Sequence, residues 1–403
     1  MYNQNLILTY AKKNYKQMFR EPEGNLKYPF LVPGSVYDNC LWDWDSWLTN
    51  IALRQFVTED ISAYEKGCIL NFLDHMEENG RIPIVILPDT IVPEPLQQNT
   101  NTHKPCLAQH AAFVVAQSGS AEWLRADFGK LCKFVDYYMT NCRHENGLYF
   151  WLDDFAIGVD NDPCTFYRPP CSSASIFLNC LMYKELEALI TIGEMLGEDM
   201  GKYQEEREHL KECVQTHCYD RKDGFYYSVD INLLPKDTGT WLHQGAPRHW
   251  DNLIQRIGVW SGFMTMWSGI ATKEQADRMV KENLLDEEAF WAPYGVRTLS
   301  KYEKMYAVVP SGNPSCWLGP IWGISNYFVF RGLVEYGYED EARILAKKTI
   351  TMFERDIRAC GEMHEYYDPE TGEPVINPGF QNWNLLSINM KEWLEQEKNV
   401  SEI

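Results

Sequence analysis

The chain has 403 residues with 57 acidic and 37 basic side chains, so its formal net charge is −20, which disfavours nucleic acid and anionic membranes as partners. Hydrophobic residues make up 45% and charged residues 23%, as in globular proteins, which excludes a disordered or fibrous chain. Aromatic residues reach 14%, with 14 Trp and 23 Tyr. This exceeds what a core requires and suits stacking on sugar rings.

The sequence also bears on location. No apolar run approaches the ~18 residues of a membrane-spanning helix, and residues 1–16 lack the cationic start and apolar stretch of a secretion signal. The twelve Cys residues stand singly, without a CxxC pair, so neither a zinc ribbon nor a disulfide scaffold is indicated. We expect a cytoplasmic protein with reduced, mostly buried thiols.

Apolar residues recur at three- and four-residue spacing along the whole chain, which predicts helices. The clearest one covers 173–196, where Lys184, Glu185, Glu187 and Glu194 lie mostly off the apolar stripe. The same pattern predicts further helices over 4–19, 44–57, 61–79, 107–118, 121–142, 202–217, 256–269, 273–284, 320–336, 339–356 and 380–395. About twelve helices predict an all-α fold.

Long segments rich in Pro, Gly, Asp and aromatic residues separate these helices, at 81–95, 146–173, 306–317 and 364–380. Loops of this length within a compact domain usually carry function. No linker composition marks a boundary, so we expect one domain over 1–403. The helices could form a double ring or a solenoid, but a solenoid should repeat its residue pattern and this chain does not.

The first chemically distinctive cluster lies at residues 33–50, where the run Trp42-Asp43-Trp44-Asp45-Ser46-Trp47 precedes a predicted helix. Asp45 or Ser46 could cap that helix, which would explain one acid but not three tryptophans. Indole rings stack on the apolar faces of pyranoses, and a carboxylate accepts two hydroxyl hydrogen bonds. The cluster therefore suits a sugar pocket.

Two further clusters hold acidic residues in loops. The sequence GVDNDP at 158–163 contains Asp160 and Asp162, and its Asp, Asn and Pro residues are equally typical of a surface turn. The sequence HEYYDPETGEP at 364–374 contains a predicted tight turn, with Glu365 before it. Neither cluster specifies a function by itself.

The fourth cluster is NPSCWLGPIW at 313–322, where Trp317 and Trp322 flank Gly319 and Pro320. These rings could pack in the core or form a stacking wall beside a ligand. Metal ligands are less evident, because no HExxH spacing supports a zinc hydrolase. Paired Asp residues in loops leave calcium open, although no EF-hand spacing occurs.

Taken in order, the four clusters resemble the inverting glycosidases of the trehalase and processing α-glucosidase clan, glycoside hydrolase families 37 and 63. The resemblance runs from about residue 30 to 385, and Trp44-Asp45-Ser46 is similar to the clan's first sugar-binding motif. It implies an (α/α)6 toroid, a double ring of six helical hairpins with long loops on the active-site face. Shorter similarities lie at 79–83, 104–105 with Gln109, 223–227 and 293–295.

The resemblance also implies roles. Gly158-Val159-Asp160-Asn161 corresponds to the loop of the general acid, and Glu365-Tyr366-Tyr367-Asp368 to the stretch of the general base. We therefore expect Asp160 and Glu365 to catalyse an inverting hydrolysis, without a metal or other cofactor. The expected contacts of the sugar substrate are Tyr37, Trp42, Trp44, Asp45, Gln109, Arg168, Trp317 and Trp322.

General acid catalysis requires Asp160 to hold a proton near neutral pH. An apolar wall or a like charge would favour the protonated form. Asp162 is available as the like charge. The wall would consist of Phe155, Ile157, Val159 and Phe166.

The nature of the substrate stays open. The region 35–38 lacks the arginine of the trehalase signature, which favours another small α-linked glycoside, such as a disaccharide or the glycerate conjugate of glucose or mannose. Arg168 and Arg297 could bind a carboxylate or phosphate on the leaving group, although such arginines more often hold structural carboxylates.

Two other functional classes fit the same residues. A sugar epimerase of the same helical fold would use histidines as acid and base, would release no aglycone, and need not lose turnover when Glu365 is replaced by Gln. A non-catalytic sugar binder is the third possibility, although the acid and base candidates in long loops count against it. The sequence leaves the oligomeric state open.

Overall fold

The computed structural model describes residues 5–90, 102–154, 157–166, 168–233, 251–309, 314–396 and 402. Twelve α-helices lie within these residues, each in or beside a predicted range, so the helix prediction is confirmed. They are α1 (Leu6–Asn14), α2 (Asp43–Leu53), α3 (Ser62–Asp74), α4 (Leu107–Ser118), α5 (Phe128–Asn141), α6 (Ile176–Leu196), α7 (Gly201–His217), α8 (Met264–Trp267), α9 (Lys273–Arg278), α10 (Gly323–Glu335), α11 (Glu339–Cys360) and α12 (Ser387–Glu395).

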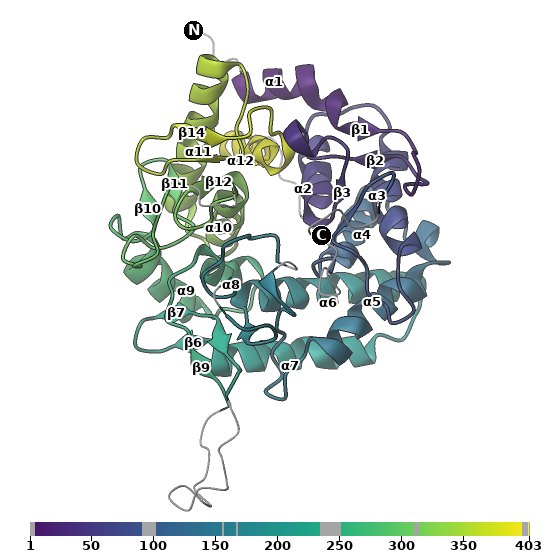
Figure 1. The fold of residues 1–403 in the computed structure, drawn as a ribbon, viewed down its shortest axis with the longest axis horizontal. Coiled ribbons are helices and arrows are strands. Elements are labelled where there is room, and N and C mark those ends of the chain that lie inside the picture. Colours follow the sequence, from purple (N-terminus) through teal and green to yellow (C-terminus); the bar gives the residue numbers. More distant parts are fainter. Residues whose placement is uncertain are drawn as a thin grey trace, which may run out of the picture.

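The even-numbered helices contact one another in sequence order, from α2 through α4, α6, α8 and α10 to α12. The 3-10 turn η7 (Asn382–Leu386), which leads into α12, packs back against α2. Figure 1 shows these helices around a common centre, with α1, α3 and α7 farther out. The inner position explains why α6 is buried over most of its surface, whereas α7 buries one side.

Short antiparallel β-pairs, which the all-α prediction omitted, join the loops. They form because the chain folds back between helices and satisfies its backbone groups locally. The strands are β1 (Phe19–Arg20), β2 (Phe30–Leu31), β3 (Leu41–Trp42), β4 (Val85–Ile86), β5 (Ser173–Ala174), β6 (Tyr219–Asp220), β7 (Phe225–Tyr226), β8 (Val229–Asp230), β9 (Leu253–Ile254), β10 (Trp291–Ala292), β11 (Gly295–Val296), β12 (Ile321–Trp322), β13 (Tyr366–Tyr367) and β14 (Pro374–Ile376).

Two of these pairs bring aromatic residues to the beginnings of inner helices. β3 pairs with β4 and ends at Trp42, the N-cap of α2. β12 pairs with β13 in the register Trp322↔Tyr366, and Trp322 is the N-cap of α10. The loops that precede α2 and α10 are thereby fixed in place.

The cysteines and the lengths of the helices bear on two further predictions. All twelve cysteines are free thiols, and most of them are buried. Among the described residues, no helix has both the length and the apolarity needed to cross a bilayer.

Candidate active site

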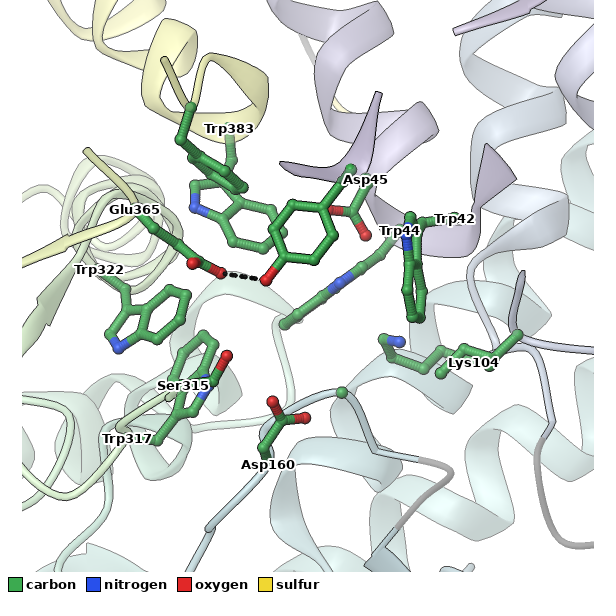
Figure 2. A pocket seen from close by; sticks show the side chains of 14 residues that line it. Trp42, Trp44, Asp45, Lys104, Asp160, Ser315, Trp317, Trp322, Glu365 and Trp383 are labelled. Carbon is green, nitrogen blue, oxygen red and sulfur yellow. Dashed lines mark hydrogen bonds between the residues drawn. The ribbon is translucent and has the colours of Figure 1, made fainter. Parts of the chain in front are cut away.

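A cavity lies where the loops before α2, α4, α6, α10 and α12 meet (Figure 2). Eight of its residues were predicted from the sequence: Tyr37, Trp42, Trp44, Asp45, Asp160, Trp317, Trp322 and Glu365. Six others of the described residues also line it: Ile84, Lys104, Gly158, Ser315, Phe380 and Trp383. The structure therefore brings the four sequence clusters together around one space.

Asp45 reaches the cavity from the first turn of α2. The helix begins at Asp43 with Trp42 as N-cap, so Asp45 does not cap it. Asn382 donates a hydrogen bond to Asp45 Oδ1. Burial, together with the negative charge of Asp43, raises the pKa of Asp45 to about 8. This carboxyl group is therefore largely protonated at neutral pH and can both donate to and accept from a sugar hydroxyl.

Lys104 is a lining residue that the sequence did not single out as a substrate contact. It is fully buried, and its Nζ lies 2.9 Å from both carboxylate oxygens of Asp43. The ammonium also lies 4.7 Å from the centroid of the Trp44 ring. These contacts fix a cation at the cavity wall, because an unpaired buried ammonium would be strongly disfavoured.

Gln109, predicted to bind the sugar, does not line the cavity. Its side-chain amide donates to the backbone oxygens of Pro105 and Leu181, at 2.8 Å and 3.1 Å, between α4 and α6. It therefore packs between two helices.

The loop that carries Asp160 is tied to the loop that carries Trp317. The side-chain oxygen of Asn161 accepts a hydrogen bond from the Trp317 N–H at 2.7 Å. The turn expected here exists, since the Asp162 N–H donates to the Val159 oxygen at 2.9 Å, but it directs Asp160 into the cavity. The surface-turn interpretation therefore does not describe this segment.

The expected surroundings of Asp160 are partly present. Ile157 and Val159 are buried, whereas Phe166 is 39% exposed. Phe155 lies outside the described residues. Asn313, from the fourth cluster, also lies outside them. Asp162 does not line the cavity. It is buried and accepts the Cys164 N–H at 2.7 Å, and burial raises its pKa to about 6.

Glu365 reaches the cavity from the residue before β13, and its exposed fraction is 4%. Tyr37 donates a hydrogen bond to Glu365 Oε1 at 3.3 Å, and Asn377 donates one to Oε2. Burial raises the pKa of Glu365 to about 7; the Asn377 hydrogen bond acts in the opposite direction, and the charge of Asp160 raises the pKa further. Figure 2 shows Asp160 and Glu365 directing their carboxyl groups into the cavity from different sides.

The tryptophans form one aromatic wall. Trp317 and Trp322 stack on each other, with centroids 3.9 Å apart and an interplanar angle of 9°. Trp44 packs edge to face on Trp383 from η7 at 5.3 Å. Trp322 also stacks on Tyr366 and Trp317 on Trp260, with centroids 4.9 Å and 6.2 Å apart, so a sugar would meet mainly the edges of the Trp317 and Trp322 rings.

The two arginines that could bind an anionic leaving group are each paired with a carboxylate. Arg168 pairs with Asp230 of β8. Arg297 is buried, donates to the backbone oxygen of Glu287 at 2.7 Å, and pairs with Glu370. Both pair with carboxylates, the alternative that the sequence left open, and neither is among the described residues that line the cavity.

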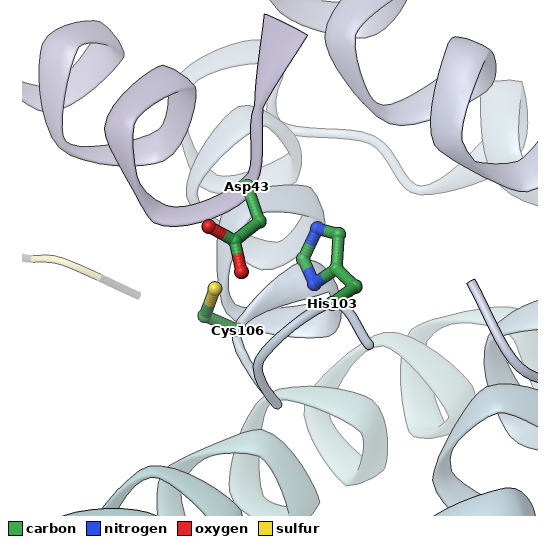
Figure 3. Close-up of side chains that lie close together, drawn as sticks. All are labelled: Asp43, His103 and Cys106. Carbon is green, nitrogen blue, oxygen red and sulfur yellow. The ribbon is translucent and has the colours of Figure 1, made fainter. Parts of the chain in front are cut away.

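Asp43, His103 and Cys106 form a buried cluster whose ligand-type atoms all lie within 4.8 Å of one another (Figure 3). The Lys104 ammonium already occupies both Asp43 oxygens. Burial lowers the pKa of His103 to about 4 and raises the pKa of the Cys106 thiol. These residues therefore fit a neutral imidazole and thiol beside an ion pair better than they fit a metal centre.

Replacing Gly158 by Ala should impair both stability and catalysis. Gly158 has φ +64°, and an added Cβ would lie 2.8 Å from Lys104 Nζ, which its ion pair holds in place. We expect a loss of about 1–2 kcal/mol in unfolding free energy and, because Asp160 would shift, a roughly 10²-fold fall in kcat. Urea unfolding and initial rates measure the two effects.

Gly119→Ala is the matched control, because Gly119 has φ +71° and no atom within 4 Å of the added Cβ. This variant should lower the unfolding free energy, because its backbone is also left-handed, but it should leave kcat unchanged. Equal rates in both variants would mean that the close approach of the added Cβ to Lys104 does not displace Asp160.

Comparison with known proteins identifies similar chains. Residues 37–383 match the family model described as the mannosylglycerate hydrolase MGH1-like glycoside hydrolase domain. A cytosolic neutral trehalase of Kluyveromyces lactis is 24% identical over 60% of this chain, and mannosylglycerate hydrolase MGH1 of Selaginella moellendorffii is 23% identical over 62%. These matches span 31% and 45% of the two relatives, less than half of either.

Solved structures share the fold. The GH63 mannosylglycerate hydrolase from Thermus thermophilus, in complex with glucose, superposes with a TM-score of 0.71 at 19% identity, covering 94% of this chain and 99% of that one. Neutral trehalase Nth1 from Saccharomyces cerevisiae gives a TM-score of 0.64 at 17% identity, covering 92% and 74%. The helical arrangement is therefore similar over nearly the whole length.

Proposed function

The chain belongs to the mannosylglycerate hydrolase MGH1-like family of glycoside hydrolases, and on this basis we propose that it hydrolyses a small α-linked glycoside with inversion at the anomeric carbon. The observation that carries the proposal is that Asp160 and Glu365, from distant loops, both reach one tryptophan-walled cavity. A pair of carboxyl groups around one sugar site is what glycoside hydrolysis requires.

In the proposed mechanism, Asp160 donates its proton to the glycosidic oxygen as the bond to the anomeric carbon breaks. Glu365 accepts a proton from a water molecule, whose oxygen attacks the same carbon from the opposite face. The products are the free sugar and the protonated leaving group, and one proton exchange with solvent restores both carboxyl groups. Tyr37 and Asn377 support the role of Glu365 because their donated hydrogen bonds favour its ionised form.

The lining of the cavity supports an exo-acting enzyme that holds one terminal sugar, because indole rings and polar side chains face the same space. Asp45 and Lys104 would bind hydroxyl groups, and Trp42 and Trp44 would contact the ring. This assignment replaces Gln109 by Lys104.

The substrate test is a panel of α-glucosides and α-mannosides, including trehalose and the glycerate conjugates of both sugars, with released sugar measured by enzymatic assay. We expect release of one terminal hexose from at least one α-linked member. Lack of release from every member would contradict the proposal. The panel also tests the epimerase alternative, which is disfavoured because none of the described lining residues is a histidine.

We also propose a helical toroid, a single catalytic domain and a cytoplasmic location for this protein. The successive contacts of the inner helices and the shared fold support an (α/α)6 toroid, formed as one catalytic domain over residues 1–403. The free thiols support a cytoplasmic location.

Activity should fall on the acidic side of neutrality, because Glu365 must be ionised to accept a proton and its pKa is raised to about 7. With an α-glycosyl fluoride, whose leaving group needs no proton, kcat/KM should drop about tenfold for each pH unit below this value. Fluoride release between pH 5 and 9 measures the profile. A flat rate down to pH 5 would contradict the assignment of Glu365.

A further inference from the structure

Two hydrogen-bond donors hold the two carboxylate oxygens of Glu365 separately. The Tyr37 hydroxyl lies 3.3 Å from Oε1, and the Asn377 amide donates to Oε2. A carboxylate with one donor on each oxygen cannot rotate without losing both bonds. We call Tyr37 and Asn377 the carboxylate clamp.

The two halves of the clamp come from opposite ends of the chain and are bonded to each other. Ser35 Oγ donates to the Pro378 oxygen at 2.8 Å, and Gly34 forms a β-bridge with Phe380. Glu365 is joined to the same segment, since its N–H donates to the Ile376 oxygen at 3.1 Å. The base and both donors therefore belong to one hydrogen-bonded unit.

The backbone of this unit is strained on both sides. Ser35 has φ +57° and Asn377 has φ +52°, in the left-handed region that side chains with a Cβ rarely adopt. Asn tolerates this conformation better than most residues, but Gly tolerates it best. A position that needed only the turn would be served by Gly, whereas a position that needs the amide donor requires Asn. Strain of this kind concentrates at functional sites.

We propose that Asn377 is a positioning residue which, together with Tyr37, holds the carboxylate of Glu365 ionised and in one orientation for proton transfer from water. The inference rests on the proposed function, because it assigns to Glu365 the role of base. The titratable groups that influence or are influenced by Glu365 are Tyr37, Asp45, Asp160 and Tyr366. None of them is altered by a change at Asn377.

The test compares Asn377→Gly with the full-length wild-type protein. Glycine retains the left-handed turn and removes the hydrogen bond that favours ionised Glu365. The pH below which kcat/KM falls, its acidic limb, should therefore rise by about one pH unit, which gives roughly tenfold lower activity at pH 6. Thermal stability should not decrease. The limb is measured by fluoride release from α-glucosyl fluoride and α-mannosyl fluoride.

Three further variants sharpen the result. Asn377→Asp places a second carboxyl group beside Glu365 and should move the limb further than Asn377→Gly. Tyr37→Phe removes the other donor and should move it in the same direction. Gln396→Gly, at φ +59° after α12, relieves the same backbone strain at a residue that does not line the cavity and should leave the acidic limb unchanged.

An acidic limb that does not move in Asn377→Gly and Asn377→Asp would overturn the proposal, and so would an equal loss of rate at every pH. In either case, wild-type turnover that still depends on Glu365 would leave the proposed function intact. If the wild-type protein releases no fluoride and Glu365→Gln changes nothing, the proposed function fails and the inference falls with it.

Discussion

Asp160→Asn should lower kcat on an ordinary α-glycoside by about 10²–10⁴-fold, because the amide cannot donate the proton that the leaving oxygen needs. On an α-glycosyl fluoride the loss should be less than about tenfold, since fluoride departs without a proton. The comparison of the two substrates in one variant separates acid catalysis from general damage to the site. Initial rates at the pH optimum measure both values.

Asp162→Asn is the matched control. It makes the same chemical change two residues away, in a side chain that accepts the Cys164 N–H and does not line the cavity. Its kcat should stay within a few-fold of the wild-type value on both substrates. Equal losses in the two variants, or equal losses on the two substrates in Asp160→Asn, would remove Asp160 from the role of acid.

Glu365→Gln should abolish turnover of both kinds of substrate, with a loss of about 10²–10⁴-fold, because water then lacks its base whatever the leaving group. Azide, an anion that needs no deprotonation, should restore turnover of an α-glycosyl fluoride and yield a β-glycosyl azide. Binding of the free hexose, measured by calorimetry, should persist because Trp42, Trp44, Asp45 and Lys104 are unchanged.

Glu373→Gln provides the control in the same hairpin. Its side chain is 68% exposed and pairs with Arg355 away from the cavity, so its activity should match that of the wild-type protein. Full activity of Glu365→Gln on α-glycosides, or failure of azide to restore any turnover while hexose binding is retained, would contradict the assignment of the base.

The helices and the family were predictable from the sequence for different reasons. The α6 segment runs for 21 residues with apolar side chains over most of its surface, a length that favours a helix over a strand. The family was recognised because four short motifs occur in a fixed order, and the family match over residues 37–383 confirms it. The small β-pairs were not predictable, because strands of two or three residues are too short to show an alternation of apolar and polar side chains.

The positions of several side chains in and around the site depend on contacts with distant residues, which the spacing of residues in the sequence does not reveal. Lys104 lies in one of the short similarities, at 104–105, but only the structure shows that its ion pair with Asp43 holds it in the wall of the cavity. Gln109 and Arg168 lie close to recognisable motifs, but their partners in α6 and β8 hold them elsewhere. Asn377 stands before Pro378 and Gly379, a run typical of a turn, but this run does not show that its side chain reaches Glu365.

The most direct measurement follows the first seconds of hydrolysis by proton NMR and records which anomer of the sugar appears. Attack of water activated by Glu365, on the face opposite the bond that Asp160 protonates, requires an α-linked substrate to release the β-anomer first, followed by slow mutarotation. Initial appearance of the α-anomer would contradict this arrangement, because retention requires a carboxylate that attacks the sugar itself.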